Sequence, residues 1–105
     1  MGRINQEKRK KVLVIRFSAI GDVVLTSPVV RGLKAAGFQV HYVVKGKFKH
    51  AIENNQNIDK LFILEQEDLK EELLTQKYSL VVDLQNNLKS LRLRKGLSQK
   101  IRVVN

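Results

Sequence analysis

The chain has 105 residues, of which 43% are hydrophobic and 29% charged, proportions typical of one small globular domain and not of a disordered chain. It contains no cysteine, which excludes a disulfide framework, a thiolate zinc site and a cysteine nucleophile. Its 20 Lys and Arg residues against 10 Asp and Glu give a net charge of +10, which favours nucleic acid, an anionic membrane surface or a phosphorylated substrate as partner.

The first part of the chain reads as a basic arm followed by a strand and a helix. Residues 1–11 carry five Lys and Arg and lack the apolar segment of a secretion signal. A buried strand is expected at 12–17 and a helix at 23–36, which ends at Gly37. Arg16 and Asp22 interrupt the apolar stretch between them, so it cannot span a bilayer. We therefore expect a cytoplasmic protein with its domain at 12–105.

Pro28 lies inside the first helical pattern. Proline removes one helical hydrogen bond and disfavours helical geometry at the residue before it. We expect a kinked helix at this point. The alternative is that Thr26 caps a helix that begins at Ser27, with Pro28 in its first turn.

The rest of the chain repeats the alternation of strands and helices. Strands are expected at 40–44, 61–64, 80–84 and 101–104, and helices at 48–53, 69–76 and 87–97. In the last helix Leu88, Leu91 and Leu93 are predicted to face inward. Continuous Val/Ile/Leu strands separated by helices predict an α/β fold, a Rossmann-like parallel sheet with helices on both faces.

The chain ends directly after the last predicted strand, at Asn105. A parallel strand without a following helix leaves one face of the sheet poorly covered. We therefore expect residues 12–105 to form a truncated domain of a larger protein, or a domain whose edge a partner covers.

The turn after the first strand is the first candidate site. Ser18, Gly21 and Asp22 place a hydroxyl, a flexible backbone and a carboxylate at the carboxyl end of a strand, where ligands bind in parallel α/β sheets. An Asp at the start of a helix is more often only a cap. The turn is neither a P-loop nor a GxGxxG, because Gly21 stands alone and no Gly-Lys-Ser/Thr follows.

A second polar group follows the fourth strand. Asp83, Gln85, Asn86 and Asn87 offer hydrogen bonds in several directions, as a polyhydroxylated ligand requires. A turn with a helix cap explains the same composition and is the simpler interpretation. Because the group ends at the same edge of the sheet as Asp22, the two together favour a binding site.

Basic residues form two further groups. Lys45 and Lys47 follow the second strand, and Arg92 lies among the cations of the last helix. Both groups can bind carboxylates or phosphates, although solvated helix faces look the same. His41 and His50 have no second His or acid at metal-ligand spacing, so a metal site is not expected.

The order and spacing of these motifs resemble the N-terminal part of the family 9 glycosyltransferases, the lipopolysaccharide heptosyltransferases. The residues that carry the resemblance are VLVIRFSAIGDVVLTSPVVRGLKAAG at 12–37, VHYVVKGKFKHAIENNQNIDKLF at 40–62 and YSLVVDLQNNLKSLRLR at 78–94. The S-x-x-G-D turn is the most specific of these, and D-L-Q-N-N-L-K-S supports it. Almost all of the chain after Lys11 is covered.

The resemblance implies one half of an inverting, metal-independent enzyme of the GT-B type. Such an enzyme moves a heptose from a nucleotide-sugar donor, ADP-heptose, to the anionic lipopolysaccharide core, in peripheral contact with the inner membrane. Asp22 occupies the position of the family's general base, and Ser18, Gln85, Asn86 and Asn87 would line the acceptor site. The donor-binding domain is absent from the sequence, so the chain by itself is expected to be inactive.

Two other functions stay open on the sequence alone. The positive charge is compatible with nucleic-acid binding, which would require exposed aromatic side chains for stacking. The chain is also compatible with a non-catalytic doubly wound module in which Asp22 is only a helix cap.

Overall fold

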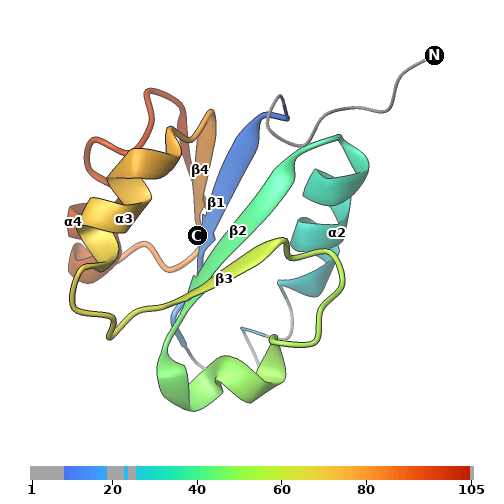
Figure 1. Cartoon of the computed structure of the whole chain (residues 1–105), viewed down its shortest axis with the longest axis horizontal. Helices are drawn as coiled ribbons and strands as arrows, with labels where there is room; N and C mark the ends of the chain where they lie inside the picture. The colour runs from blue at the N-terminus through green and yellow to red at the C-terminus, as the bar shows by residue number, and fades with distance from the viewer. Residues whose placement is uncertain (1–8, 19–22, 24–25, 105) are drawn as a thin grey trace.

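Five parallel strands form the centre of the domain. The computed structural model describes residues 9–18, 23 and 26–104. The strands are β1 (Lys11–Ile15), β2 (Gln39–Val44), β3 (Lys60–Ile63), β4 (Leu80–Asp83) and β5 (Ile101–Val103). They are arranged in the order β3-β2-β1-β4-β5, and every pair is parallel (Figure 1). The predicted Rossmann-like fold is confirmed.

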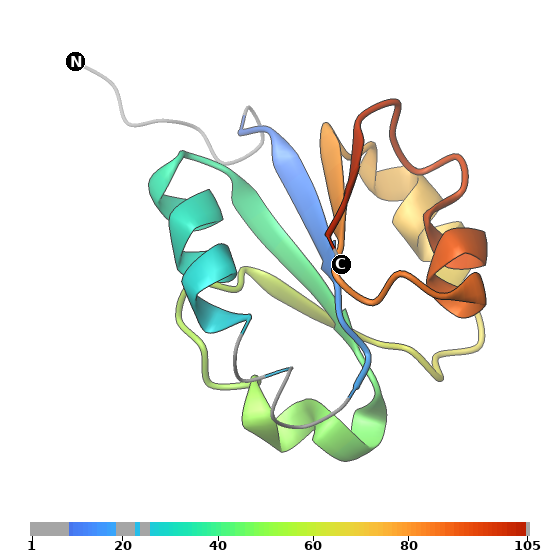
Figure 2. The ribbon, with the colours of Figure 1, turned by 180° about the vertical axis from the view of Figure 1, so that it is seen from behind.

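Helices cover both faces of the sheet. The elements between the strands are α2 (Ser27–Ala35), the 3-10 helix η2 (Gly46–Ala51), α3 (Leu69–Gln76) and α4 (Leu88–Arg94). Figures 1 and 2 show α2 on one side of the sheet and α3 with α4 on the other. The helices on the two sides together bury both faces of the sheet, as strands that are apolar on both faces require.

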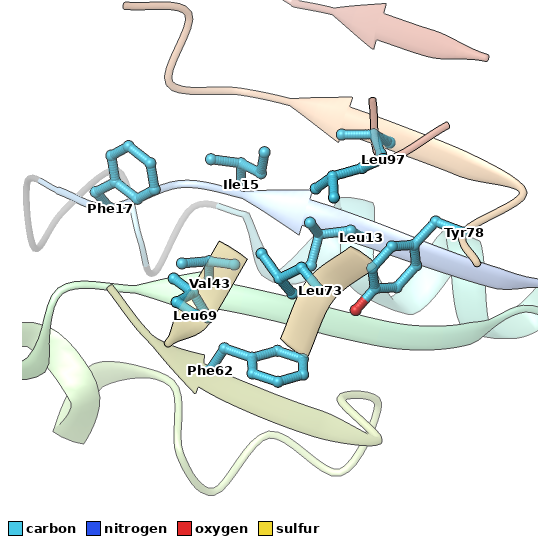
Figure 3. Close-up of a cluster of buried hydrophobic side chains, with 10 residues drawn as sticks. Leu13, Ile15, Phe17, Val43, Phe62, Leu69, Leu73, Tyr78 and Leu97 are labelled. Atoms are coloured by element: carbon cyan, nitrogen blue, oxygen red, sulfur yellow. The ribbon is translucent and has the colours of Figure 1, made fainter. Parts of the chain in front are cut away.

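Alternate residues of β1 supply the two halves of the core. Leu13 and Ile15 are fully buried in the cluster on the α3 and α4 side, together with Phe62, Leu73 and other side chains (Figure 3). Val12 and Val14 are fully buried in the cluster on the α2 side. Successive strand side chains point to opposite faces, so β1 holds the two layers together.

The start of α2 differs from the predicted kinked helix. The helix begins at Ser27 with Pro28 in its first turn and Thr26 at the N-cap position, which is the start that the alternative predicted. The Thr26 side chain makes no cap hydrogen bond to the helix; its Oγ1 donates to the carbonyl of Val23 and lies 2.9 Å from the Tyr42 hydroxyl. Proline at this position has no amide hydrogen to satisfy, which favours a fresh start over a kink.

The inward face of α4 was also predicted incorrectly. Leu88 and Leu91 are 59% and 48% exposed, whereas Ser90 is fully buried and Leu93 packs against the core. The N-cap explains the rotation: the Asn87 side chain accepts from the Ser90 amide, and the Ser90 hydroxyl oxygen accepts from the Asn87 amide. This capping box fixes which side of the first turn faces the sheet.

The far end of α4 is held by a lysine from α3. Nζ of Lys70 donates to the carbonyls of Arg92, Leu93 and Lys95 at 2.9, 2.6 and 2.5 Å. These carbonyls have no partners within the helix, and a cation there complements the helix dipole. Burial lowers the pKa of Lys70, with a smaller contribution from Lys95. The two helices on this face are therefore joined by charge as well as by packing.

Candidate functional site

The candidate site lies where the strand order reverses, at the carboxyl ends of β1 and β4. The chain proceeds from β1 to β2 and β3 on one side, then returns to place β4 on the other side of β1. In open α/β sheets the crevice at such a switch point is the usual ligand site. The last paired residues at this edge are Ile15 and Asp83.

Gln85 joins the two strands just beyond that pair. Its Oε1 accepts hydrogen bonds from the amides of Phe17 at 3.0 Å and of Ser18 at 3.4 Å. In the opposite direction, the guanidinium Nη1 of Arg16 donates to the carbonyl of Leu84 at 2.6 Å. The loop after β4 and the segment after β1 are thus held together by side-chain bonds in both directions.

Asp83 is a buried anchor within the loop that follows β4. Its side chain is fully buried, and Oδ1 accepts from the amides of Gln85 and Asn86 at 3.0 and 2.8 Å. Oδ2 forms an ion pair with Nη1 of Arg94 at 2.8 Å. Both carboxylate oxygens are therefore engaged inside the protein, so Asp83 fixes the shape of the loop.

The two asparagines occupy the end of the same loop. Asn86 has a φ of 49°, a left-handed conformation that asparagine tolerates better than most residues. Asn87 is the N-cap of α4, so its side-chain oxygen is committed to the Ser90 amide. Both positions are exposed, so their remaining groups are accessible to a ligand.

A basic group lies beyond β2, at the same edge of the sheet. Lys45 directly follows the strand as the N-cap of η2, and the exposed ammonium of Lys47 lies 5.1 Å from the centre of the Phe48 ring. Glu65 accepts from the Gly46 amide at 2.9 Å, and this bond lowers its pKa, with weaker contributions from Lys45 and Lys89.

Three of the predicted site residues are not among the polar side chains placed at this edge. Gly21 and Asp22 lie outside the described residues, so the turn is known here only by its flanks, Ser18 and Val23. Arg92 is exposed and lies five residues beyond the N-cap of α4, a rise of about 7.5 Å away from the carboxyl edge. The structure thus gathers Ser18, Gln85, Asn86 and Asn87 at one edge and sets Arg92 apart.

Sequence reasoning gave Arg16 no role in the site and grouped Arg94 only with the ligand-binding cations of the last helix, although both hold the site together. The sequence feature that could have revealed Arg16 is its place directly after a buried strand. A cation at such a position needs a nearby carbonyl or acid. Arg94 was hidden among the cations of a helix that looks solvated. Its Asp83 partner lies eleven residues earlier, beyond the reach of helical spacing.

The described part of the chain holds no cluster of three His, Cys, Asp or Glu side chains suited to a metal ion. Within the same residues, no helix is both long and apolar enough to cross a membrane.

The fold and this edge define a Rossmann-like domain with a group of polar side chains at its switch point. No family model matches the chain. Lipopolysaccharide heptosyltransferase 1 of Campylobacter coli is 31% identical over 99 residues, which cover 85% of this chain and 29% of that protein. The crystal structure of the glycosyl transferase family 9 from Veillonella parvula DSM 2008 matches with a TM-score of 0.77 and 25% identity, over 88% of this chain and 31% of that one.

The chain is therefore related to the family 9 glycosyltransferases, as its motifs predicted. It spans less than one third of the length of either relative.

Proposed function

We propose that the chain forms the acceptor-side domain of an inverting glycosyltransferase. The reaction would move a heptose or similar sugar from a nucleotide-sugar, ADP-heptose, to the lipopolysaccharide core. The relationship to a heptosyltransferase over 85% of the chain supports this proposal. So do the polar side chains gathered at the switch point, since a sugar acceptor needs several hydrogen-bonding groups at one edge.

In the proposed mechanism Asp22 is the general base. Its carboxylate takes the proton from an acceptor hydroxyl while that oxygen attacks the anomeric carbon. The bond from this carbon to the donor phosphate breaks, and the nucleoside diphosphate leaves with the electron pair. An ionised aspartate is a weak base at neutral pH, so its contribution depends on close and oriented contact with the hydroxyl.

The observation that carries the proposal is the Gln85 bridge. Its Oε1 holds the amides of Phe17 and Ser18, the two residues from which the S-x-x-G-D turn departs. Gln85 would therefore position the start of the turn that contains Asp22, while Asp83 and Arg94 hold the loop that carries Gln85. A base that acts through proximity needs such support from neighbouring elements.

The charges indicate how the acceptor would be held. Lys45 and Lys47 would bind phosphate or carboxylate groups of an anionic lipopolysaccharide core held at the inner membrane surface, on its cytoplasmic side. The donor would bind mainly to a domain beyond this chain, and the reaction would need no metal or other cofactor. The chain alone would then bind acceptor without turnover.

The test uses the full-length product of the gene that encodes this chain, with ADP-heptose and a lipopolysaccharide-core acceptor. We expect Asp22→Asn to abolish release of the nucleoside diphosphate while folding and donor binding remain intact. Arg31→Gln on the exposed surface of α2 serves as the matched control and should keep full turnover. Undiminished turnover by the Asp22 variant would remove it from the chemistry and leave it as a helix cap.

The nucleic-acid alternative is less well supported by the structure. Of the six aromatic residues, four are buried, and the other two, Phe38 and Phe48, are half-buried. Single-stranded nucleic acid binds to exposed aromatic faces, which this surface does not present. A salt-dependent DNA shift assay tests the alternative directly.

A further inference from the structure

A basic cleft lies at the amino ends of the strands, the edge opposite the candidate site. It consists of two adjoining cavities of about 530 and 460 Å³, which share Lys10 and Ser79. Their walls are the segments that lead into β1, β4 and β5 and the end of α3. In Figure 1 these segments lie at the top of the sheet, and η2 lies at the bottom. We call this feature the amino-edge cleft.

The lining of the amino-edge cleft is cationic and contains no acid. Its charged residues are Arg9, Lys10, Lys11, Lys77, Lys100 and Arg102. Among the described residues, Nζ of Lys11 donates a hydrogen bond to Oε1 of Gln76 at 3.1 Å, and none of the six cations forms an ion pair there. Crowding like charges without a counter-charge is unfavourable, so the arrangement favours an anion bound from solution.

Two of these cations, Arg9 and Lys77, lie in settings that are unfavourable for the folded state. Nε of Arg9 is buried and has no hydrogen-bond partner in the part of the chain that the structure describes. Leaving a buried donor unsatisfied is unfavourable, and a charged one more so. Lys77 ends α3 with a φ of 57°, the left-handed conformation in which glycine is the usual residue. The C-terminus of α3 attracts cations, which explains part of the charge at Lys77 but not Arg9 or Lys100.

The larger cavity adds an apolar wall to this charge. Phe38, Tyr78 and Leu80 line it beside Ser79, Ser98 and the cations. The Tyr78 hydroxyl is engaged with Nδ1 of His41 at 2.7 Å, so the ring offers mainly carbon to the cavity. The cleft therefore suits a ligand with a phosphate group attached to a less polar part.

We propose that the amino-edge cleft binds a phosphate-bearing ligand, with the phosphate among Arg9, Lys10 and Lys77 and the rest of the molecule against Phe38 and Tyr78. The site does not depend on the proposed glycosyl transfer, because it uses none of the residues assigned to that reaction. A phospholipid headgroup and a soluble phosphate ester share this chemistry, and the experiment separates these two sources.

The test titrates the 105-residue chain at low ionic strength with pyrophosphate, followed by amide shifts in NMR. In parallel, the chain is sedimented with vesicles of phosphatidylglycerol or of phosphatidylcholine. Saturable shifts around Lys10, Ser79 and Lys100 with pyrophosphate support a soluble phosphate ester. Binding to phosphatidylglycerol vesicles alone supports a lipid headgroup.

Three variants decide whether the cleft is responsible. Lys77→Gly removes a cation and also relieves the left-handed backbone, so we expect this variant to keep its fold. We expect Lys77→Gly and Arg9→Gln each to weaken binding by about threefold to tenfold. Arg31→Gln removes the same charge from α2, outside both cavities, and should leave the affinity unchanged. Binding to neither probe, or equal weakening by all three variants, would overturn the proposal.

Discussion

His41 is expected to make the stability of the domain depend on pH. The side chain is 1% exposed in the middle of the core, and its Nδ1 lies 2.7 Å from the Tyr78 hydroxyl. Burial lowers the pKa of His41 from 6.5 to about 4, with smaller contributions in the same direction from Lys11 and Lys60 and an opposing one from Asp59. The native protein therefore keeps this imidazole neutral at pH values where the unfolded chain protonates it.

The sign and size of the effect follow from linkage. Between pH 6.5 and pH 4 the unfolded chain binds more protons than the native state, so stability falls as the pH falls. A pKa lowered from 6.5 to about 4 corresponds to about 3 kcal/mol lost over the whole interval, of which about 2 kcal/mol is lost between pH 7 and pH 5. Above pH 7 the contribution of His41 to the free energy of unfolding no longer changes with pH.

The assay is urea unfolding at pH 7, 6 and 5, followed by circular dichroism. The test variant replaces His41 and Tyr78 together by phenylalanine, which removes both partners of the buried bond and leaves neither unsatisfied. We expect it to lose about 2 kcal/mol less than wild type between pH 7 and pH 5. His50→Gln, at a side chain that is 89% exposed, should behave as wild type. An unchanged pH dependence in the double variant would refute the reasoning.

Substitutions at three positions, with two control variants, test other parts of the fold and site by urea unfolding. Leu73→Ala should cost about 3 kcal/mol because it empties the centre of the α3-side core, while Leu74→Ala, 48% exposed, should change stability by less than about 0.5 kcal/mol. Asp83→Asn should cost about 3 kcal/mol, since it leaves its arginine without a counter-charge; no loss would show that the pair contributes nothing. Gln85→Ala should cost about 1–3 kcal/mol and speed hydrogen exchange of the two amides it holds, whereas Gln85→Glu keeps the acceptor oxygen and should restore protection.

The layer structure could be predicted from the sequence because each strand is a continuous apolar run between helical patterns. The range 69–76 predicted for α3 matches the structure, since leucines at helical spacing mark it and Lys77 ends it in a left-handed conformation. The inward face of α4 could not be predicted in the same way. Leucine spacing pointed to Leu88 and Leu91, but the bonds between Asn87 and Ser90 set the rotation of the helix, and a hydrophobic pattern does not contain that information.

The sequence predicts the residues at the candidate site from their type and from their position after a strand. It does not predict which residues they contact. Asp83 was expected to face a ligand because it follows an apolar strand. The structure commits it to Arg94 and to the amides of its own loop. Which of several nearby polar residues a buried carboxylate will contact depends on the packing of α4 against the sheet, and sequence spacing does not specify that packing.

These internal hydrogen bonds determine which polar groups remain available to a ligand at the carboxyl edge. Both carboxylate oxygens of Asp83 and the side-chain oxygens of Gln85 and Asn87 accept hydrogen bonds from the protein itself. The groups that remain are mainly donors: the side-chain amide nitrogens of Gln85 and Asn87 and the ammonium groups of Lys45 and Lys47. An edge rich in donors favours a ligand rich in oxygen acceptors and negative charge. In the proposed reaction we assign the carboxylate that accepts the proton to Asp22, in the turn after β1.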